Sequence, residues 1–221
     1  VLSRAKVRRY ANRDAGALED LLKASTAKKK LIVTDSVFSM DGTIAPLPDI
    51  VSFLEKYNAM LVIDDAHATG VLGKTGRGSL EHFGIKDHPS IIQMGTLGKA
   101  LGSFGAFVTA QQEVIDLLIS RARPFIYTTA LPPSVCAAAA KAIDIIDENP
   151  GLIRKLWDNT KTIKQGLTEA GFDTMGSVTP IIPVKTGDSS RTMEASRRLL
   201  EHGVFVQGIR PPTVPEGTSR L

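Results

Sequence analysis

The feature that most constrains the fold is a strand–helix–strand pattern in the first third of the sequence. Two short apolar runs, residues 31–34 and 61–64, have the length of buried strands. Between them, residues 50–57 carry the apolar spacing of a helix. Such a unit forms parallel strands joined by a right-handed crossover. The sequence therefore predicts an α/β protein with a mostly parallel sheet.

Further elements are expected on both sides of this unit. The expected strands are residues 91–94, 105–109, 181–184 and 204–207, with a short one within 1–10, and the expected helices are 14–24, 112–123, 134–148, 152–170 and 189–202. Asn149, Pro150 and Gly151 together form a boundary signal. We predict a large domain over residues 1–148 and a smaller, incomplete α+β domain over residues 149–221.

Composition narrows the classes of protein that need to be considered. The net charge is +4, but aromatic residues make up only 5%, which is too few for a base-stacking platform, so we expect no nucleic-acid partner. No apolar run approaches the roughly 20 residues that span a bilayer, so we expect no membrane partner. The single cysteine, Cys136, favours a reducing, cytoplasmic location. Because the chain opens on Val1 and closes just after a loop rich in proline and glycine, we expect a fragment of a longer polypeptide.

The first candidate for chemistry is the end of the strand over residues 61–64. Ligands in open α/β sheets bind at the carboxyl ends of strands, and Asp64 stands there. A carboxylate can stabilise a cationic ring nitrogen, which is the partner that pyridoxal phosphate (PLP) requires. His67, three residues on, could face the cofactor ring. The plain structural alternative is an aspartate that caps the next turn and a surface histidine.

The second candidate is Lys99, which lies in the glycine-rich stretch from Met94 to Val108. A lysine that forms a Schiff base must lose its proton, and flanking glycines let the backbone approach a ligand closely. Thr96 could donate its hydroxyl to a phosphate oxygen. The plain alternative is a lysine in an ordinary glycine-rich turn. Together the two stretches suggest opposite walls of one PLP site.

Two competing interpretations use the same region. Residues 68–75, ATGVLGKT, match a relaxed phosphate-loop pattern, but a phosphate loop must open a helix, and Gly76 to Gly78 should break one. A metal site could draw on Asp64, Asp65 and His67, but consecutive strand residues point to opposite faces. We therefore expect no metal.

Three motifs in order, SVFSMDG with a following AP, VIDDAHATGVLG with a following GRG, and GTLGKALGSFGAFV, resemble the α-oxoamine synthases. This family consists of fold-type I, PLP-dependent enzymes with an aspartate-aminotransferase-like large domain. They join an amino acid to an acyl thioester and release CO₂. The resemblance covers essentially the whole chain, which corresponds to the middle and later part of such an enzyme.

The resemblance implies a role for several residues. Lys99 holds the cofactor and moves the α-proton, Asp64 pairs with the pyridine nitrogen, and His67 and Ser39 contact the phenolic oxygen. Thr96 binds the phosphate. The resemblance also implies a homodimer, in which Thr129, in the segment that starts at Tyr127, reaches the cofactor of the neighbouring subunit. Thr213 is implied to contact the substrate.

The substrates remain open at this point. The stretch from Gly208 to Leu221 is most similar to the branch of the family that condenses L-alanine with a pimeloyl thioester in biotin biosynthesis. Other stretches, such as residues 8–22, also resemble the branch that joins glycine to acetyl-CoA. A third possibility is an inactive paralogue that serves as a binding partner. An inactive paralogue would have no chemical need to keep all four of Lys99, Asp64, His67 and Thr96, so their presence argues against this possibility.

Overall fold

The computed structural model describes residues 3–221 and divides into two compact units. The first unit comprises residues up to 37 together with 45–153, and the second comprises residues 38–44 together with 154–221. The division falls within the first turn of helix α7 (Gly151–Glu169). The expected boundary after residue 148 lies in the connection just before that helix, and the sequence pattern gave no sign that residues 38–44 join the second unit.

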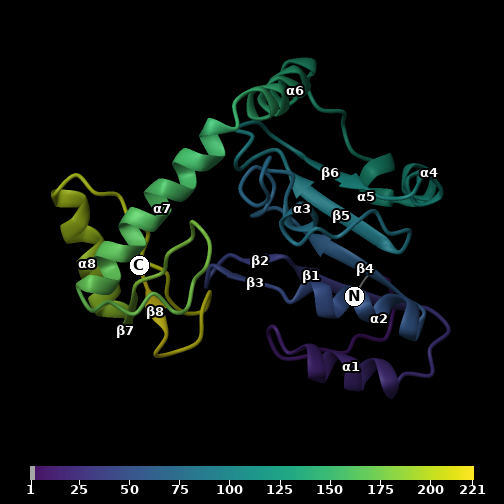
Figure 1. The fold of residues 1–221 in the computed structure, drawn as a ribbon, viewed down its shortest axis with the longest axis horizontal. Coiled ribbons are helices and arrows are strands. Elements are labelled where there is room, and N and C mark those ends of the chain that lie inside the picture. Colours follow the sequence, from purple (N-terminus) through teal and green to yellow (C-terminus); the bar gives the residue numbers. More distant parts are fainter. Residues whose placement is uncertain (1–2) are drawn as a thin grey trace. The chain divides into compact units, whose positions relative to one another are not determined.

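The first unit is built on a four-stranded sheet (Figure 1). Its strands are β1 (Lys30–Asp35), β4 (Ala59–Asp64), β5 (Ile91–Thr96) and β6 (Ala106–Thr109), in the order β1-β4-β5-β6. The first three are parallel and β6 is antiparallel to β5. The predicted mostly parallel sheet is therefore confirmed.

One face of the sheet carries the core. Helix α2 (Leu47–Tyr57) packs on β4 and buries Leu47, Ile50 and Leu54 to 1% exposure or less. The facing strand residues Leu61 and Ile63 are fully buried. Each such side chain contributes roughly 1.5–3 kcal/mol on transfer from water. Helix α1 (Ala15–Lys23) packs beyond α2, so this face is covered by two helical layers (Figure 1).

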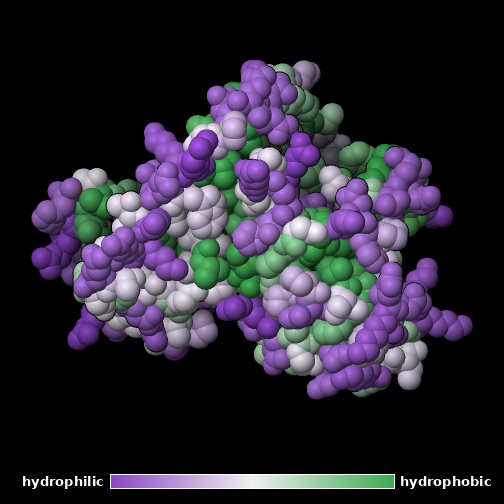
Figure 2. Space-filling model, viewed as in Figure 1, coloured by the Kyte–Doolittle hydropathy of each residue, from purple (hydrophilic) through white to green (hydrophobic). Residues whose placement is uncertain are grey.

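The opposite face of β1 is open among the described residues. Leu31 and Val33 are 59% and 61% exposed, whereas their neighbours Ile32 and Thr34 are buried. In the space-filling view, hydrophobic residues are visible at the surface over the sheet of this unit (Figure 2). Parallel strands are usually covered on both faces. This face is therefore apolar surface that a further layer of protein could cover.

The remaining elements surround the sheet or build the second unit. They are β2 (Val37–Phe38), β3 (Thr43–Ile44), α3 (Ser79–His82), α4 (Gln112–Arg121), α5 (Arg123–Ile126), α6 (Pro133–Glu148), α8 (Ser189–Glu201), β7 (Lys185–Gly187) and β8 (Ser219–Arg220). No helix among residues 3–221 is long and apolar enough to cross a membrane.

Three expected strands are wrong. Residues 3–10 form no strand, and Val1 and Leu2 lie outside the described residues. Residues 181–184 are irregular, because Pro183 has no N–H to donate to a neighbouring strand. The strand of this region is β7, which begins just after them and pairs with β8. Residues 204–207 form no strand, because their backbone bonds to helix α8 instead. The Val204 N–H donates to the Leu199 carbonyl, and the Val206 carbonyl accepts from the Ser196 hydroxyl.

Candidate functional site

The carboxyl edge of the sheet brings acidic side chains together. Asp35 ends β1 and Asp64 ends β4, and the two are register partners in the parallel pair. Register partners project from the same face of a sheet, with neighbouring strands about 4.8 Å apart. Asp64 is half-buried, and its Oδ1 accepts a hydrogen bond from the Ala66 N–H at 2.9 Å. One carboxylate oxygen is thus fixed by the following turn.

The neighbouring carboxylate, Asp65, has a different environment. It is completely buried, and its Oδ2 accepts from the Ser79 N–H at 2.9 Å and from the Gln93 amide at 2.7 Å. Gly78 leaves room for it, since a Cβ there would lie 2.1 Å from the same oxygen. Asp65 therefore anchors the loop before α3. It does not share a ligand site with Asp64, and no three His, Cys, Asp or Glu side chains in residues 3–221 are grouped as metal ligands.

His67 lies in the turn after β4, half-buried and within electrostatic reach of three charged groups. Burial lowers the pKa of His67 below its ordinary value, and the positive charge of Lys99 lowers it further. The charges of Asp64 and Asp35 act in the opposite direction but are smaller. At neutral pH the ring is therefore uncharged, able to donate or accept one hydrogen bond at each nitrogen.

Lys99 lies in the loop that follows β5. The Leu97 N–H donates to the Gly105 carbonyl at 2.9 Å, and the Ser103 N–H donates to the Leu97 carbonyl at 2.8 Å, which closes the loop at its base. The Lys99 side chain is exposed, and its charge acts on both Asp35 and His67. The amine thus lies near the acidic edge of the sheet on a braced loop.

Thr96 is the last residue of β5 and belongs to the same edge. Its hydroxyl donates to the Gly105 carbonyl at 3.1 Å and accepts from the Gly98 N–H at 3.2 Å. To donate to a phosphate oxygen, the hydroxyl must exchange its bond to Gly105. In this structure Thr96 also braces the loop that carries Lys99.

Asp35 is a member of this cluster that the sequence interpretation missed. Burial raises the pKa of Asp35 above its ordinary value, as does the negative charge of Asp64, while His67 and Lys99 partly offset this. Ser36, the next residue, is buried and donates through both its N–H and its Oγ to the Asp64 carbonyl, at 2.9 and 3.2 Å. The missed signal was the strand end: extending the strand by one residue places Asp35 beside Asp64.

Three expected site residues lie elsewhere in the chain. Thr129 is exposed and follows the short helix α5 in the first unit, beside Tyr127, which is 77% exposed. Ser39, half-buried, and Thr213, exposed, both belong to the second unit. The structure of the first unit therefore brings together Asp64, His67, Thr96 and Lys99.

The loop over residues 68–78 does not have the architecture of a nucleotide phosphate loop. The N–H groups of Thr75 and Arg77 donate to the two carboxylate oxygens of Glu81, at 2.9 and 3.0 Å. The helix that follows, α3, is only four residues long. The backbone donors that would hold a phosphate are thus already bound to an internal carboxylate.

Comparisons with known proteins identify the family of this chain. The family profile "Aminotransferase class I and II" matches residues 1–221. An 8-amino-7-oxononanoate synthase from Citrifermentans bemidjiense is 54% identical over all of this chain, which covers 57% of that protein. The chain therefore spans a little over half the length of that curated relative.

Two solved structures have the same fold. One is a high-resolution structure of SPT (serine palmitoyltransferase) with PLP, with a TM-score of 0.87 and 32% identity over 94% of this chain and 53% of that one. The other is 8-amino-7-oxononanoate synthase from Francisella tularensis, with a TM-score of 0.83 and 29% identity over 99% of this chain and 62% of that one. The resemblance to α-oxoamine synthases is confirmed, and this chain belongs to the aminotransferase class I and II family.

Proposed function

We propose that this protein is a PLP-dependent acyltransferase that condenses L-alanine with a pimeloyl thioester, CoA- or carrier-protein-bound, and releases CO₂ and the free thiol of the acyl carrier. The product is 8-amino-7-oxononanoate, an intermediate of biotin biosynthesis. The observation that carries the proposal is the cluster of Asp64, His67 and Lys99 at the carboxyl edge of the sheet. The identity of 54% with an 8-amino-7-oxononanoate synthase over the whole chain supports the choice of reaction.

The side chains of this edge fit PLP chemically. The cofactor needs an amine that forms a covalent bond to its aldehyde, a carboxylate for its ring nitrogen and a neutral donor or acceptor near its phenolic oxygen. Lys99, Asp64 and His67 supply one of each, and the charges of Lys99 and Asp64 both act on the pKa of His67. The backbone beside Lys99 is open, since a Cβ on Gly98 would meet no atom closer than 3.7 Å and one on Gly102 none within 4 Å.

Asp64 has the electrostatic role in this proposal. Bound PLP supplies an electron sink for negative charge that develops at the α-carbon of the amino acid. The Asp64 carboxylate keeps the ring nitrogen protonated through a charge-assisted hydrogen bond. Because its Oδ1 is held by Ala66, the carboxylate needs little reorganisation during the reaction.

Lys99 has the role of acid and base. Its Nζ would hold the cofactor, and in the reaction it would take the α-proton of the amino acid and later return one to the same carbon. The base of its loop is closed by Leu97, Ser103 and Gly105, which keeps the amine near the α-carbon. His67, neutral at pH 7, orients the cofactor ring without competing for the proton.

The remaining contacts extend the proposal. Thr96 binds the phosphate, Ser39 the phenolic oxygen and Thr213 the substrate. Thr129 reaches the cofactor of the neighbouring subunit, so the working protein is a homodimer with shared sites. A cytoplasmic location follows from the proposed pathway and stays a prediction.

The experiment that tests the proposed function is a substrate panel with the full-length protein and PLP. Three pairs are offered: L-alanine with pimeloyl-CoA, glycine with acetyl-CoA and L-serine with palmitoyl-CoA. Mass spectrometry follows the ketone products and CO₂ release is measured in parallel. We expect turnover with the first pair at least ten-fold above the other two. Turnover only with glycine and acetyl-CoA would identify the other branch of the family, and no turnover with any pair would favour an inactive paralogue.

A further inference from the structure

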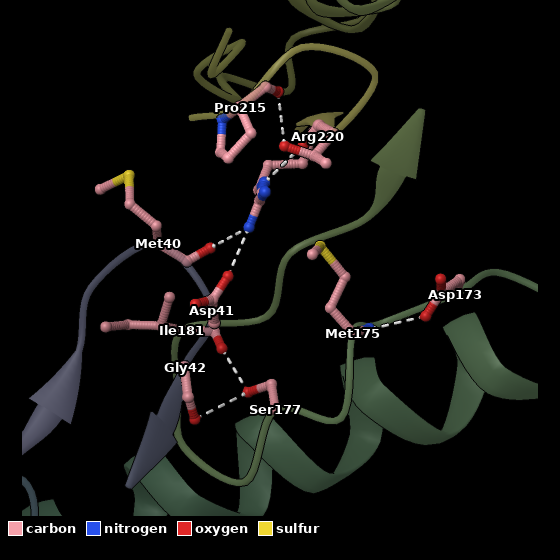
Figure 3. A network of polar contacts seen from close by, with 10 residues as sticks. Met40, Asp41, Gly42, Asp173, Met175, Ser177, Ile181, Pro215 and Arg220 are labelled. Atoms are coloured by element: carbon pink, nitrogen blue, oxygen red, sulfur yellow. Dashed lines mark hydrogen bonds and ion pairs between the residues drawn. The ribbon is translucent and has the colours of Figure 1, made fainter. Parts of the chain in front are cut away.

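A buried arginine in the second unit holds two separate segments together. Arg220, in β8, is only 4% exposed. Its Nη1 donates to the Asp41 carboxylate at 2.5 Å and to the Met40 carbonyl at 2.9 Å, and its Nε donates to the Thr218 carbonyl at 2.9 Å (Figure 3). We call this arrangement the Asp41–Arg220 clasp.

The clasp is the meeting point of two loops. Asp41 belongs to the turn between β2 and β3, which also contains Ser39. On the other side, Arg220 and Ile209 exchange backbone hydrogen bonds at 2.8 and 3.0 Å, and these close the loop that contains Thr213. The Nε bond to Thr218 fixes the end of that loop from inside. One guanidinium therefore sets both the Ser39 turn and the Thr213 loop.

The Ser39 turn is fixed at a second point. The Gly42 carbonyl accepts from the Ser177 hydroxyl at 3.3 Å (Figure 3). It also accepts from the Val178 N–H and from the Thr179 hydroxyl, each at 3.0 Å. With Gly42 and Asp41 both held, the backbone beside Ser39 has little freedom. The Ser39 hydroxyl itself makes no hydrogen bond within residues 3–221, so it is available to a ligand.

The geometry also excludes one role for Arg220. An arginine that binds a substrate carboxylate must present an accessible, unpaired guanidinium. The guanidinium of Arg220 is buried, and its charge is matched by Asp41 at 2.5 Å. Removing one partner of such a pair leaves an uncompensated charge in a poorly solvated place. Arg220 therefore acts on its neighbours rather than on substrate.

We propose that Asp41 and Arg220 are positioning residues, which fix the Ser39 turn for the cofactor and the Thr213 loop for the substrate. This inference rests on the proposed function, because Ser39 and Thr213 matter only if they contact cofactor and substrate. It adds to that function a pair of residues that touch neither ligand. It also predicts that the two halves of the clasp affect different steps.

Two substitutions in the full-length protein separate the two halves. Arg220→Lys keeps a positive charge for Asp41, but a lysine ammonium lacks the planar fork that also reaches Thr218. Asp41→Asn keeps an acceptor for Nη1 and the arginine's bonds to both carbonyls, but it removes the charge pairing. The matched control is Arg197→Lys, which alters an exposed arginine of the same unit that pairs with Glu194 and Glu201.

Amide hydrogen exchange without cofactor is the first readout. We expect Arg220→Lys to raise exchange in peptides that cover residues 209–219, and Asp41→Asn to raise it in peptides that cover residues 37–44. The second readout is ligand affinity. We expect Arg220→Lys to raise KM for the amino acid about ten-fold, and Asp41→Asn to raise the Kd of PLP about ten-fold, as loss of one hydrogen bond to a charged group would do. We expect kcat to change less than KM in Arg220→Lys, and the control to match the wild type throughout.

The outcomes distinguish the inference from the proposed function. Increased exchange or a lower Tm with unchanged KM and Kd in both variants would overturn the positioning role and leave only a structural one. Unchanged exchange in both variants would overturn the clasp itself. A wild-type protein that neither binds PLP nor turns over substrate would overturn the proposed function and, with it, the positioning role, whereas the exchange result would still report on the clasp.

Discussion

At the scale of single residues, two adjacent carboxylates have opposite roles. Asp65 is buried and bonded to Ser79 and Gln93, so it holds the loop before α3. Asp64 faces the edge where Lys99 and His67 lie. The alternation of strand side chains was enough to predict that the two point apart, and the position at a strand end was enough to select Asp64. The third acid of this edge, Asp35, was missed because the predicted strand ended at residue 34, one residue before the end of β1.

Substitution of Asp64 by asparagine separates its charge from its structural contact. Asparagine retains an Oδ1 that accepts from Ala66, so the turn after β4 should persist and Tm should match the wild type. Loss of the negative charge weakens stabilisation of the ring nitrogen, and we expect kcat to fall about 10²-fold or more. Steady-state kinetics with L-alanine and pimeloyl-CoA measure this. Retention of full kcat would contradict the role of Asp64.

The protonation of His67 depends on its charged neighbours in a predictable direction. Burial and Lys99 lower the pKa of His67 below 6.5, so the neutral ring persists to a pH below that value. Lys99→Met removes a positive charge that disfavours the imidazolium, so the pKa should rise. Asp35→Asn removes a negative charge that favours it, so the pKa should fall.

The pH dependence of His67 modification by diethyl pyrocarbonate, which reacts with neutral imidazole, measures these shifts in cofactor-free protein. The midpoint is read from the mass of the His67 peptide in the wild type and both variants. Shifts in the opposite directions would show that the three side chains do not form one electrostatic cluster.

At the scale of elements, the parallel strands and long helices were predictable because each carries a complete apolar pattern. The alanine-rich helix over residues 134–148 was expected to follow Pro132 and Pro133, and α6 begins one residue earlier, at Pro133. The expected strand over residues 181–184 failed because local apolar runs do not reveal where the partner strand is. In the second unit the ladder begins at Lys185, where β8 supplies the partner.

The turn between β2 and β3 depends on a glycine with no space for a side chain. Gly42 has φ of +65°, and a Cβ there would lie 2.0 Å from the Ile181 carbonyl oxygen and 2.4 Å from Ser177 Oγ. We expect Gly42→Ala to lower the free energy of unfolding by about 3 kcal/mol, from backbone strain and overpacking together.

The matched control for Gly42 is Gly176→Ala in the same unit. Gly176 has φ of +68°, but a Cβ there meets nothing within 4 Å. Gly176→Ala should therefore cost only the strain of the left-handed backbone conformation, about 1 kcal/mol. Urea unfolding of both variants measures the difference. Equal losses would mean that the close approach to Ile181 and Ser177 is absent in solution.

At the scale of the whole molecule, the two units divide the expected site residues between them. Asp64, His67, Thr96 and Lys99 lie in the first unit, and Ser39 and Thr213 lie in the second. The sequence motifs predicted all six, because each motif is a local pattern. The membership of residues 38–44 in the second unit was beyond sequence reasoning, since it depends on contacts with Ser177, Thr179 and Arg220, more than 130 residues away.

The proposed sharing of sites between subunits has a test in mixed dimers. If Thr129 acts on the partner's cofactor, a dimer of one Lys99→Met subunit and one Thr129→Ala subunit contains one intact site. Co-refolded mixtures should then have more activity than either variant alone, with sedimentation velocity to verify that dimers form. Activity no higher than the mean of the two variants would contradict sharing through Thr129.

The central claim is that the carboxyl edge of the sheet holds PLP on Lys99, and reduction by borohydride tests it most directly. The full-length protein is incubated with PLP, reduced and digested, and the modified peptide is mapped by mass spectrometry. We expect a phosphopyridoxyl group on Lys99, none on Lys74 in the loop over residues 68–78, and none anywhere in the Lys99→Met variant. A stable group on another lysine, or none on the full-length protein, would contradict it.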